Sequence, residues 1–540
     1  MKQKKYIILA AVATLFLMAA LGVVRFRPAS DRWESPTVSN PFASSPSPLL
    51  KDSDFKCDHC NVVIVGMTNV RRDHMGMYGY SRDTTPNIDA FAKRSVVFEN
   101  AFTPTSWTLP VVASILTSLY PFQHGTMGLS GSLSHLDGRL TTLADVLKRN
   151  GYRTATFTGG RDLLPSFGVT SRFDENFYPD ADLANSAPSA PNSLPVQLGS
   201  VISTKDLMSH YGPFGFSVPK AIEWMQGHKD KPFFTYVQGF DAHCPFASPQ
   251  KIDRFTQGLR SDLDFRNCYI NYGEADPVEV NGKKYFTVLA PPSDPTKPGD
   301  DLPSQLISEE DVHYMSALYD GKISEVDAQV GRLLDFMEKD GLLDNTIVIL
   351  LAEHGDMFGK HGRFMRGGPL RGTYYDDVLH VPLVFYFPKN SQKGIHRPQI
   401  AELTDLAPTV LDALSLEIPP QFAGSSLRTI ATSDAPGRGE AFAGSVFFPG
   451  ISPFFTNITL ISALRTPDWK LIYENVFKPI SGLEDKPLST FLDPRKEDVE
   501  VLTQLFDMKN DPEELTDVSA KHADIVESLR REMEERIRQF

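Results

Sequence analysis

The stretch EVDAQVGRLLDFMEKDGLLDNTIVILLAEHGD, residues 325–356, shows how this chain alternates helices with buried strands. Its first half has the pattern of an amphipathic helix, and Gly341 follows as a helix stop. The second half contains TIVILLA, a continuous apolar run that is typical of a strand buried on both faces of a parallel sheet. The same order of helix, glycine and strand recurs in residues 140–160. This alternation predicts an α/β fold with helices covering both faces of the sheet.

Three other apolar runs add strands to this sheet. They are NVVIVG (61–66), with which the fold begins, KPFFTYVQGF (231–240) and VPLVFYFP (381–388). We predict one large domain over residues 61–430. The proline-rich, polar segments 161–205 and 244–310 are expected to loop over the carboxyl edge of the sheet.

Beyond about residue 430 the alternation weakens. A strand-like stretch, ALRTPDWKLIYEN (463–475), is followed by a charged helical pattern over residues 522–540. We therefore predict a smaller C-terminal α+β subdomain over residues 431–540.

Composition limits the class of protein. The chain has 540 residues, of which 41% are hydrophobic, so it can bury a large core. Its formal net charge of −13 argues against a nucleic-acid partner, because such proteins usually present a basic face to the phosphates. An anionic substrate would have to be attracted locally, for example by a metal ion.

The N-terminus carries a targeting signal. MKQKK precedes the apolar run YIILAAVATLFLMAALGVV (6–24), which is close to the ~20 residues that span a bilayer. We predict an uncleaved signal anchor over residues 1–27, with a cleaved signal peptide as the alternative. Residues 28–60, rich in serine and proline, are expected to be a linker. The folded part would then lie in the cell envelope, on the periplasmic or extracellular side.

Four cysteines, Cys57, Cys60, Cys244 and Cys268, suit an exported protein. We expect two structural disulfides, whose pairing the sequence leaves open. The CxxC spacing of Cys57 and Cys60 also suggests redox chemistry, which is the less favoured interpretation.

Polar residues at the ends of the predicted strands are the first candidates for a site, because α/β sheets bind ligands at the carboxyl ends of their strands. Glu353 and His354 in AEHGD could bind a divalent ion, or simply mark the exit from the core. His243 in DAHCP could handle a proton, although a lone histidine is more often structural. Thr68 and Asn69 end the first strand and are weak, uncharged oxygen ligands.

A further candidate lies in SWTLPVVASILTSLYP, residues 106–121. Pro110 and the apolar run after it predict the start of a helix, so Thr108 is a helix cap, a nucleophile or both.

Taken together, these stretches resemble the sulfatase family of the alkaline phosphatase superfamily, from Asn61 to about Asp511. The matching segments occur in the family's order and include GMTNVRRDHMGMYGY, SWTLPVVASILTSLYPFQHG, GFDAHCPF, AEHGD, LRGTYYDDVLHVPLV and LTDLAPTVLDAL. The resemblance implies an alkaline-phosphatase-like central mixed sheet, mostly parallel, flanked by helices.

The resemblance also implies a mechanism. In the family a nucleophile at a helix start attacks sulfur or phosphorus while a divalent metal activates it, and Thr108 falls on that position. Because the family's cysteine is absent there, formylglycine chemistry is excluded, and a covalent threonine ester is expected. His243 matches the family's histidine, and Arg371 lies near a family lysine that contacts the transferred group.

One divalent metal ion, calcium, manganese or zinc, is implied, with ligands at the positions of Glu353, His354, Thr68 and Asn69. Three residues depart from the family pattern. Thr68 replaces an aspartate, Glu353 is longer than the usual aspartate, and Val112 replaces an arginine or histidine.

Three functions follow. We favour an exported, membrane-anchored hydrolase that cleaves a sulfate or a phosphate or phosphonate ester through a metal-activated Thr108. Its substrate would be a sulfated or phosphorylated glycan, lipid or small molecule. The alternatives are a pseudoenzyme that acts as a binding or scaffolding module, and a head-group transferase that uses the same nucleophile.

Overall fold

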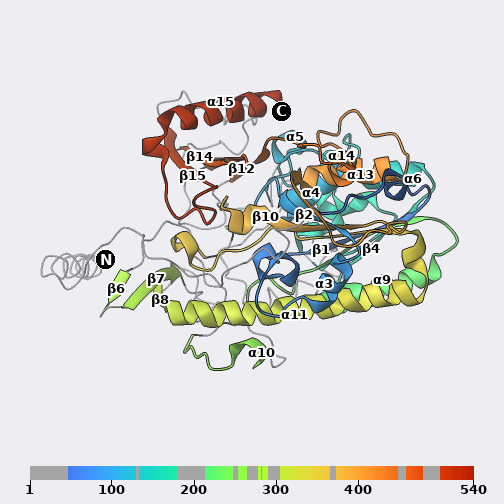
Figure 1. The fold of residues 1–540 in the computed structure, drawn as a ribbon, viewed down its shortest axis with the longest axis horizontal. Coiled ribbons are helices and arrows are strands. Elements are labelled where there is room, and N and C mark those ends of the chain that lie inside the picture. The colour runs from blue at the N-terminus through green and yellow to red at the C-terminus, as the bar shows by residue number, and fades with distance from the viewer. Residues whose placement is uncertain are drawn as a thin grey trace, which may run out of the picture.

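A central eight-stranded sheet organises the computed structural model (Figure 1). The structure describes residues 47–128, 133–159, 161–179, 213–246, 253–263, 265, 278–280, 283–289, 304–364, 366, 373–447, 458–477 and 499–540. In spatial order the strands are β11 (Ile395–Glu402), β2 (Val96–Phe102), β10 (His380–Tyr386), β9 (Thr346–Leu351), β1 (Asn61–Met67), β5 (Phe233–Gly239), β3 (Arg153–Phe157) and β4 (Glu175–Phe177).

The sheet is mixed and mostly parallel, which confirms the predicted class. β10 runs antiparallel to β2 and β9, whereas β1 pairs in parallel with both β5 and β9. β1 lies in the middle of the sheet, and all seven of its residues are buried, as its continuous apolar run predicts. Ile64 is in register with Tyr236 of β5 and Ile349 of β9, so these three side chains share one face.

Helices cover both faces of this sheet (Figure 1). One face packs against α4 (Thr108–Thr117), α6 (Leu143–Arg149), α13 (Leu406–Ala413) and α14 (Arg428–Thr432). The opposite face packs against α3 (Pro86–Ala92), α9 (Phe214–Gly227) and the long α11 (Glu309–Lys339). Shorter helices are α2 (Asp52–Phe55), α5 (Pro121–His124), α10 (Asp253–Thr256) and α12 (Asp376–Leu379). α11 begins earlier than the sequence pattern suggests, because Ser308 and Asp311 form a capping box at its start.

The C-terminal part forms a second, antiparallel sheet. Its strands are β12 (Ala441–Phe447), β13 (Ile458–Arg465), β14 (Trp469–Phe477) and β15 (Val499–Asp507), and α15 (Ala523–Gln539) lies across them (Figure 1). Leu529, Met533 and Ile537 recur every four residues along α15 and are buried against this sheet. The stretch 463–475, predicted as one strand, spans two strands and the turn between them. The boundary at residue 430 stays a prediction.

The segments predicted to be loops contain regular structure. β6 (Val278–Val280), β7 (Lys283–Leu289) and β8 (Ser304–Ser308) form a small antiparallel sheet. Residues 161–177 form three short 3-10 helices and β4. The loop prediction was therefore wrong in these parts, because proline and polar residues also suit short edge strands.

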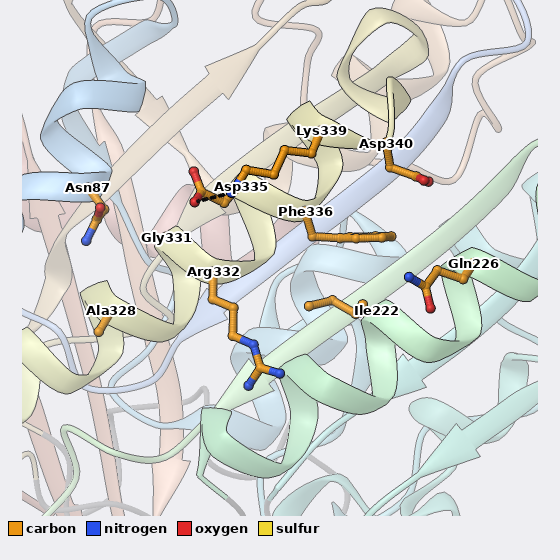
Figure 2. A pocket seen from close by; sticks show the side chains of 10 residues that line it. All are labelled: Asn87, Ile222, Gln226, Ala328, Gly331, Arg332, Asp335, Phe336, Lys339 and Asp340. Atoms are coloured by element: carbon orange, nitrogen blue, oxygen red, sulfur yellow. Dashed lines mark hydrogen bonds and ion pairs between the residues drawn. The ribbon is translucent and has the colours of Figure 1, made fainter.

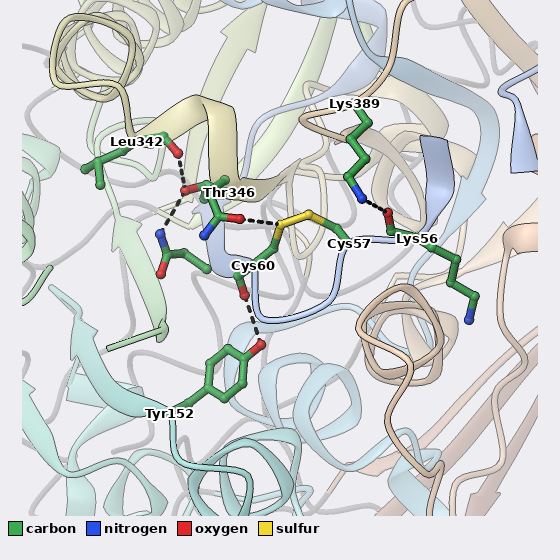
Figure 3. Close-up of a disulfide and its surroundings, with 9 residues drawn as sticks. Lys56, Cys57, Cys60, Tyr152, Leu342, Thr346 and Lys389 are labelled. Carbon is green, nitrogen blue, oxygen red and sulfur yellow. Dashed lines mark hydrogen bonds between the residues drawn. A yellow bond between two sulfur atoms is a disulfide. The ribbon is translucent and has the colours of Figure 1, made fainter. Parts of the chain in front are cut away.

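Cys57 and Cys60 form a disulfide at the amino end of β1, with a Cα–Cα distance of 5.6 Å (Figure 3). The Tyr152 hydroxyl donates to the Cys60 carbonyl at 3.0 Å, which ties this turn to the start of β3. Cys244 is also disulfide-bonded, and Cys268 lies outside the described residues. The Cys57–Cys60 disulfide thus sits at the end of the sheet opposite to the predicted site.

Among the residues that the structure describes, no helix has the length and apolar character needed to cross a bilayer. The predicted signal anchor, residues 1–27, and the linker up to residue 46 lie outside the described residues.

Candidate active site

The carboxyl ends of β1, β5 and β9 meet the start of α4, and the predicted residues converge there. Thr108 is fully buried as the first residue of α4, and its Oγ1 lies 3.2 Å from Nε2 of His354, just after β9. Trp107, and not Thr108, occupies the N-cap position, and no side chain caps this helix. The capping interpretation of Thr108 was therefore wrong. Thr108 is already the first helical residue, and its hydroxyl faces His354 instead of a backbone N–H of the first turn.

The ring of His354 turns its Nε2 to the Thr108 hydroxyl. Its Nδ1 lies 2.9 Å from the Gly355 carbonyl, which can only accept, so Nδ1 carries the ring hydrogen. Nε2 is then left with its lone pair facing the Thr108 hydroxyl. Burial lowers the pKa of His354 well below its usual range, and the positive charge of Arg366 acts in the same direction. The ring is therefore neutral, with its lone pair at Nε2.

His243 follows β5 and lies near the same ring. Its Nδ1 is 2.6 Å from the Cys244 carbonyl, and burial lowers its pKa to about 3, with a further contribution from Arg366. A charge on His243 would in turn lower the pKa of His354, so the two histidines belong to one site.

Arg366 is the cationic residue of this site, and sequence reasoning missed it. Its side chain is buried, and its Nε and Nη1 donate no hydrogen bond within the described residues. The predicted Arg371 lies outside the described residues. Arg363, Arg366 and Arg371 all follow AEHGD, and spacing alone did not select among them.

Glu353 points onto the face of the sheet beneath α4. It lies two residues beyond the end of β9 and is hydrogen-bonded to Tyr236 and Gln238 of β5, whose side chains are on the face of Ile349 and Leu351. Its Oε1 accepts from the Tyr236 hydroxyl at 2.8 Å and from Nε2 of Gln238 at 2.7 Å. Burial raises the pKa of the Glu353 carboxyl.

Gln238 also connects Glu353 to the end of β1. Its Nε2 donates to Thr68 Oγ1 at 3.0 Å. The neighbouring Asn69 has a positive φ of 70° and donates from Nδ2 to Asp356 Oδ2 at 2.7 Å and to the Ala242 carbonyl at 3.0 Å. Asp356 closes the AEHGD stretch among the strand-end candidates, whereas Gln238 and Tyr236 were not singled out from the sequence. A polar pair inside the apolar run KPFFTYVQGF was the available signal.

A surface groove lies away from these residues (Figure 2). It has a volume of about 680 Å³ and is lined by Asn87 of α3, by Ile222 and Gln226 of α9, and by residues 328–340 of α11 and its end. These parts of α9 and α11 precede β5 and β9, so the groove lies at the amino end of the sheet. It is distinct from the site around Thr108.

The sheet order, the strand-end site and the second sheet define a hydrolase of the alkaline-phosphatase-like class. A family model described as Sulfatase matches residues 60–416, and a second, N-sulphoglucosamine sulphohydrolase, C-terminal, matches residues 359–478. The chain therefore belongs to the sulfatase family, whose members hydrolyse sulfate or phosphonate esters.

Similar proteins agree with this assignment. An arylsulfatase of Clostridium perfringens (strain 13 / Type A) is 25% identical over 403 residues, covering 68% of this chain and 78% of the relative. Arylsulfatase K of Mus musculus is 26% identical, covering 82% and 73%. An N-acetylglucosamine-6-O-sulfatase of Bacteroides thetaiotaomicron is 22% identical, covering 89% and 86%.

Solved structures share the fold. A phosphonate monoester hydrolase of Agrobacterium radiobacter superposes with a TM-score of 0.59 at 19% identity, covering 89% of this chain and 95% of that one. A protein solved in complex with its substrate D-glucosamine-2-N,6-O-disulfate gives a TM-score of 0.61 at 20% identity, covering 89% and 98%.

Family members generally bind a divalent metal ion, so the predicted ligands can be tested for fit. Thr68 and Asn69 are uncharged, and the Glu353 Oε1 atom already accepts two hydrogen bonds. Among the described residues, three buried oxygens of this site have no hydrogen-bond partner, namely Asn69 Oδ1, Gln238 Oε1 and Glu353 Oε2, and only the last belongs to an acid. Calcium usually takes six to eight oxygens, several of them from carboxylates. Zinc or manganese would use His354, but its Nε2 faces the Thr108 hydroxyl at 3.2 Å, and no three acid or imidazole ligand atoms meet here among the described residues. These residues therefore do not fit a resident divalent ion.

Away from Thr108, the described residues contain one group of three histidine and carboxylate side chains that are close enough to share a metal ion. His361, Asp377 and Glu514 have such atoms within 4.8 Å. Asp377 is already ion-paired with Arg71 and Lys360, and Glu514 with Lys470. These cations already compensate the two carboxylates.

Proposed function

We propose that this chain hydrolyses a sulfate or phosphonate ester, with Thr108 as the nucleophile and His354 as its base. The observation that carries the proposal is the 3.2 Å contact between Thr108 Oγ1 and His354 Nε2 at the start of α4. A hydroxyl is a weak nucleophile until an adjacent base takes its proton. His354 has the tautomer and the neutral charge that this role needs.

The reaction takes two steps. In the first, the Thr108 oxygen attacks sulfur or phosphorus, its proton passes to His354 Nε2, and the bond to the ester oxygen breaks. His354 then returns the proton to the leaving alkoxide, which releases an alcohol and leaves an ester on Thr108. In the second step water attacks the same centre, His354 takes the water proton, and the Thr108 oxygen leaves and recovers a proton from His354.

Two features of the site support an anionic substrate. The N-terminus of α4 places the positive end of the helix dipole at Thr108. Arg366 adds a full positive charge, and its buried Nε and Nη1 have no hydrogen-bond partner among the described residues. A guanidinium binds two oxygens of an anion at once, which suits a sulfate or phosphonate group.

For the substrate we propose a sulfated sugar. Support comes from the relative called N-acetylglucosamine-6-O-sulfatase and from the similar structure solved with D-glucosamine-2-N,6-O-disulfate. We also propose that the protein is exported and anchored in the cell envelope by residues 6–24, as the apolar run there suggests.

A second candidate is a binding module without turnover. Thr68, Asn69 and Val112 stand where the resemblance implies charged or polar residues, and Val112 is fully buried in α4. Such a protein would keep the Arg366 anion site while lacking hydrolysis.

Turnover of 4-nitrophenyl sulfate and of a 4-nitrophenyl phosphonate monoester separates the two. For an enzyme, we expect Thr108→Ala to reduce kcat at least on the order of 1000-fold, because the nucleophile is lost. Thr117→Ala, the same change in the last turn of α4, is the control and should retain activity. Mass spectrometry of quenched wild type should find a sulfo or phosphonyl adduct on the Thr108 peptide. Full activity of Thr108→Ala would refute the assignment.

A further inference from the structure

We infer that this site works without a resident divalent metal ion, because the Gln238 amide joins the oxygens that a metal would bind and Arg366 supplies the positive charge. The inference rests on the proposed function, in that the pocket around Thr108 takes an anionic ester.

The first observation is the position of the Gln238 amide. Its Nε2 donates at 2.7 Å to Glu353 Oε1 and at 3.0 Å to Thr68 Oγ1. These are two of the oxygens that the resemblance assigns to the metal. A cation and an N–H donor compete for the same lone pairs, so the amide group takes up acceptor positions on both oxygens and leaves an ion only Oε2 of this carboxylate.

A second donor acts on the same carboxylate. The Tyr236 hydroxyl donates to Glu353 Oε1 at 2.8 Å. Gly66 of β1 makes room for this arrangement, since a Cβ there would lie 2.5 Å from Glu353 Oε1 and 2.6 Å from the Tyr236 oxygen. The absence of a side chain at Gly66 therefore leaves the space in which the Glu353 carboxylate lies on the sheet and accepts these hydrogen bonds.

The remaining ligand position offers only the uncharged amide oxygen of Asn69, while its amide nitrogen is held by two hydrogen bonds. Asn69 donates both to Asp356 Oδ2 and to the Ala242 carbonyl. Asp356, the nearest additional acid, also accepts at Oδ1 from the Met357 N–H at 2.8 Å. In the described part of the chain, Glu353 belongs to no group of three acid or histidine side chains that could share one ion.

Arg366 then explains how an anion is held. Its buried Nε and Nη1 make no hydrogen bond in the described structure, and such unpaired donors are unfavourable until an anion accepts from them. One guanidinium would thus provide the charge that a divalent ion provides elsewhere in the family.

Metal content of the full-length protein, purified without and with added CaCl₂, MnCl₂ or ZnCl₂ and then desalted, tests the inference. We expect substoichiometric metal throughout and the same Tm in EDTA as in each metal. One tightly retained ion per chain, with a Tm that falls in EDTA, would overturn it.

Two variants test the residues. Gln238→Glu places an acceptor against Glu353 and should lower Tm, whereas Gln226→Glu, the same change on an exposed position of α9, should not. An unchanged Tm in Gln238→Glu would contradict the inference. In EDTA, inorganic sulfate should raise the Tm of wild type, and Arg366→Met should weaken sulfate binding at least about tenfold. A sulfate effect that requires added metal would overturn it.

These outcomes are separable from those of the proposed function. Metal-free protein without turnover would refute hydrolysis and leave the inference standing. Metal-loaded protein with turnover would support hydrolysis and refute the inference that the site is metal-free.

Discussion

Replacing Gly66 by alanine tests the geometry on which the site depends. The added Cβ would lie 2.5 Å from Glu353 Oε1, 2.6 Å from the Tyr236 oxygen and 3.2 Å from its ring carbon. Overpacking of a tight core usually lowers stability by about 1–3 kcal/mol. Displacing the carboxylate from its donors would add about 1–3 kcal/mol. Alanine regains about 0.5–1 kcal/mol through lower chain entropy, so we expect Gly66→Ala to lower the free energy of unfolding by about 1–5 kcal/mol.

Urea denaturation followed by tryptophan fluorescence measures this change, and Gly227→Ala is the matched control. Gly227 ends α9, and an added Cβ there meets nothing within 4 Å. The control should be neutral or more stable by up to about 1 kcal/mol. Gly66→Ala could be as stable as wild type, to within about 0.5 kcal/mol, only if the added Cβ lay well beyond 3 Å from Glu353 Oε1. That result would show that the Glu353 carboxylate does not lie over β1.

Two further predictions concern buried charges. Burial raises the pKa of Asp241 to about 6, so the folded state holds this proton more tightly than the unfolded state, whose pKa is near 3.8. Stability should therefore fall by about 2 kcal/mol as pH rises from 4 to 7, and Asp241→Asn should flatten that dependence in urea titrations at several pH values. Lys470 is fully buried and lies 2.6 Å from both Asp376 and Glu514. Lys470→Met should lower stability by about 3–5 kcal/mol, whereas the exposed Lys339→Met should change it by less than about 0.5 kcal/mol; equal effects would contradict the ion-pair argument.

The sequence by itself determined the sheet and the place of the site. Continuous apolar runs such as NVVIVG and TIVILLA predict buried strands, because a strand covered on both faces has no polar side. Once the strands are parallel, their carboxyl ends share one edge, so Thr68, His243 and Glu353 had to meet there. The start of a helix near Thr108 followed from Pro110 in the same way.

Only the tertiary structure decided what these residues do. Thr108 and His354 are 246 positions apart, and Gln238 and Glu353 are 115 apart, so no local pattern relates their atoms. Glu353 lies on the face of the sheet because Tyr236 and Gln238 of β5 donate hydrogen bonds to it. These residues become its neighbours only when the strands pair. For the same reason, the sequence could not show that Arg366, of the three arginines after AEHGD, lies beside the two histidines. Local propensity sets where a strand ends, while the hydrogen-bond partners of a buried side chain are set by the packing of distant segments.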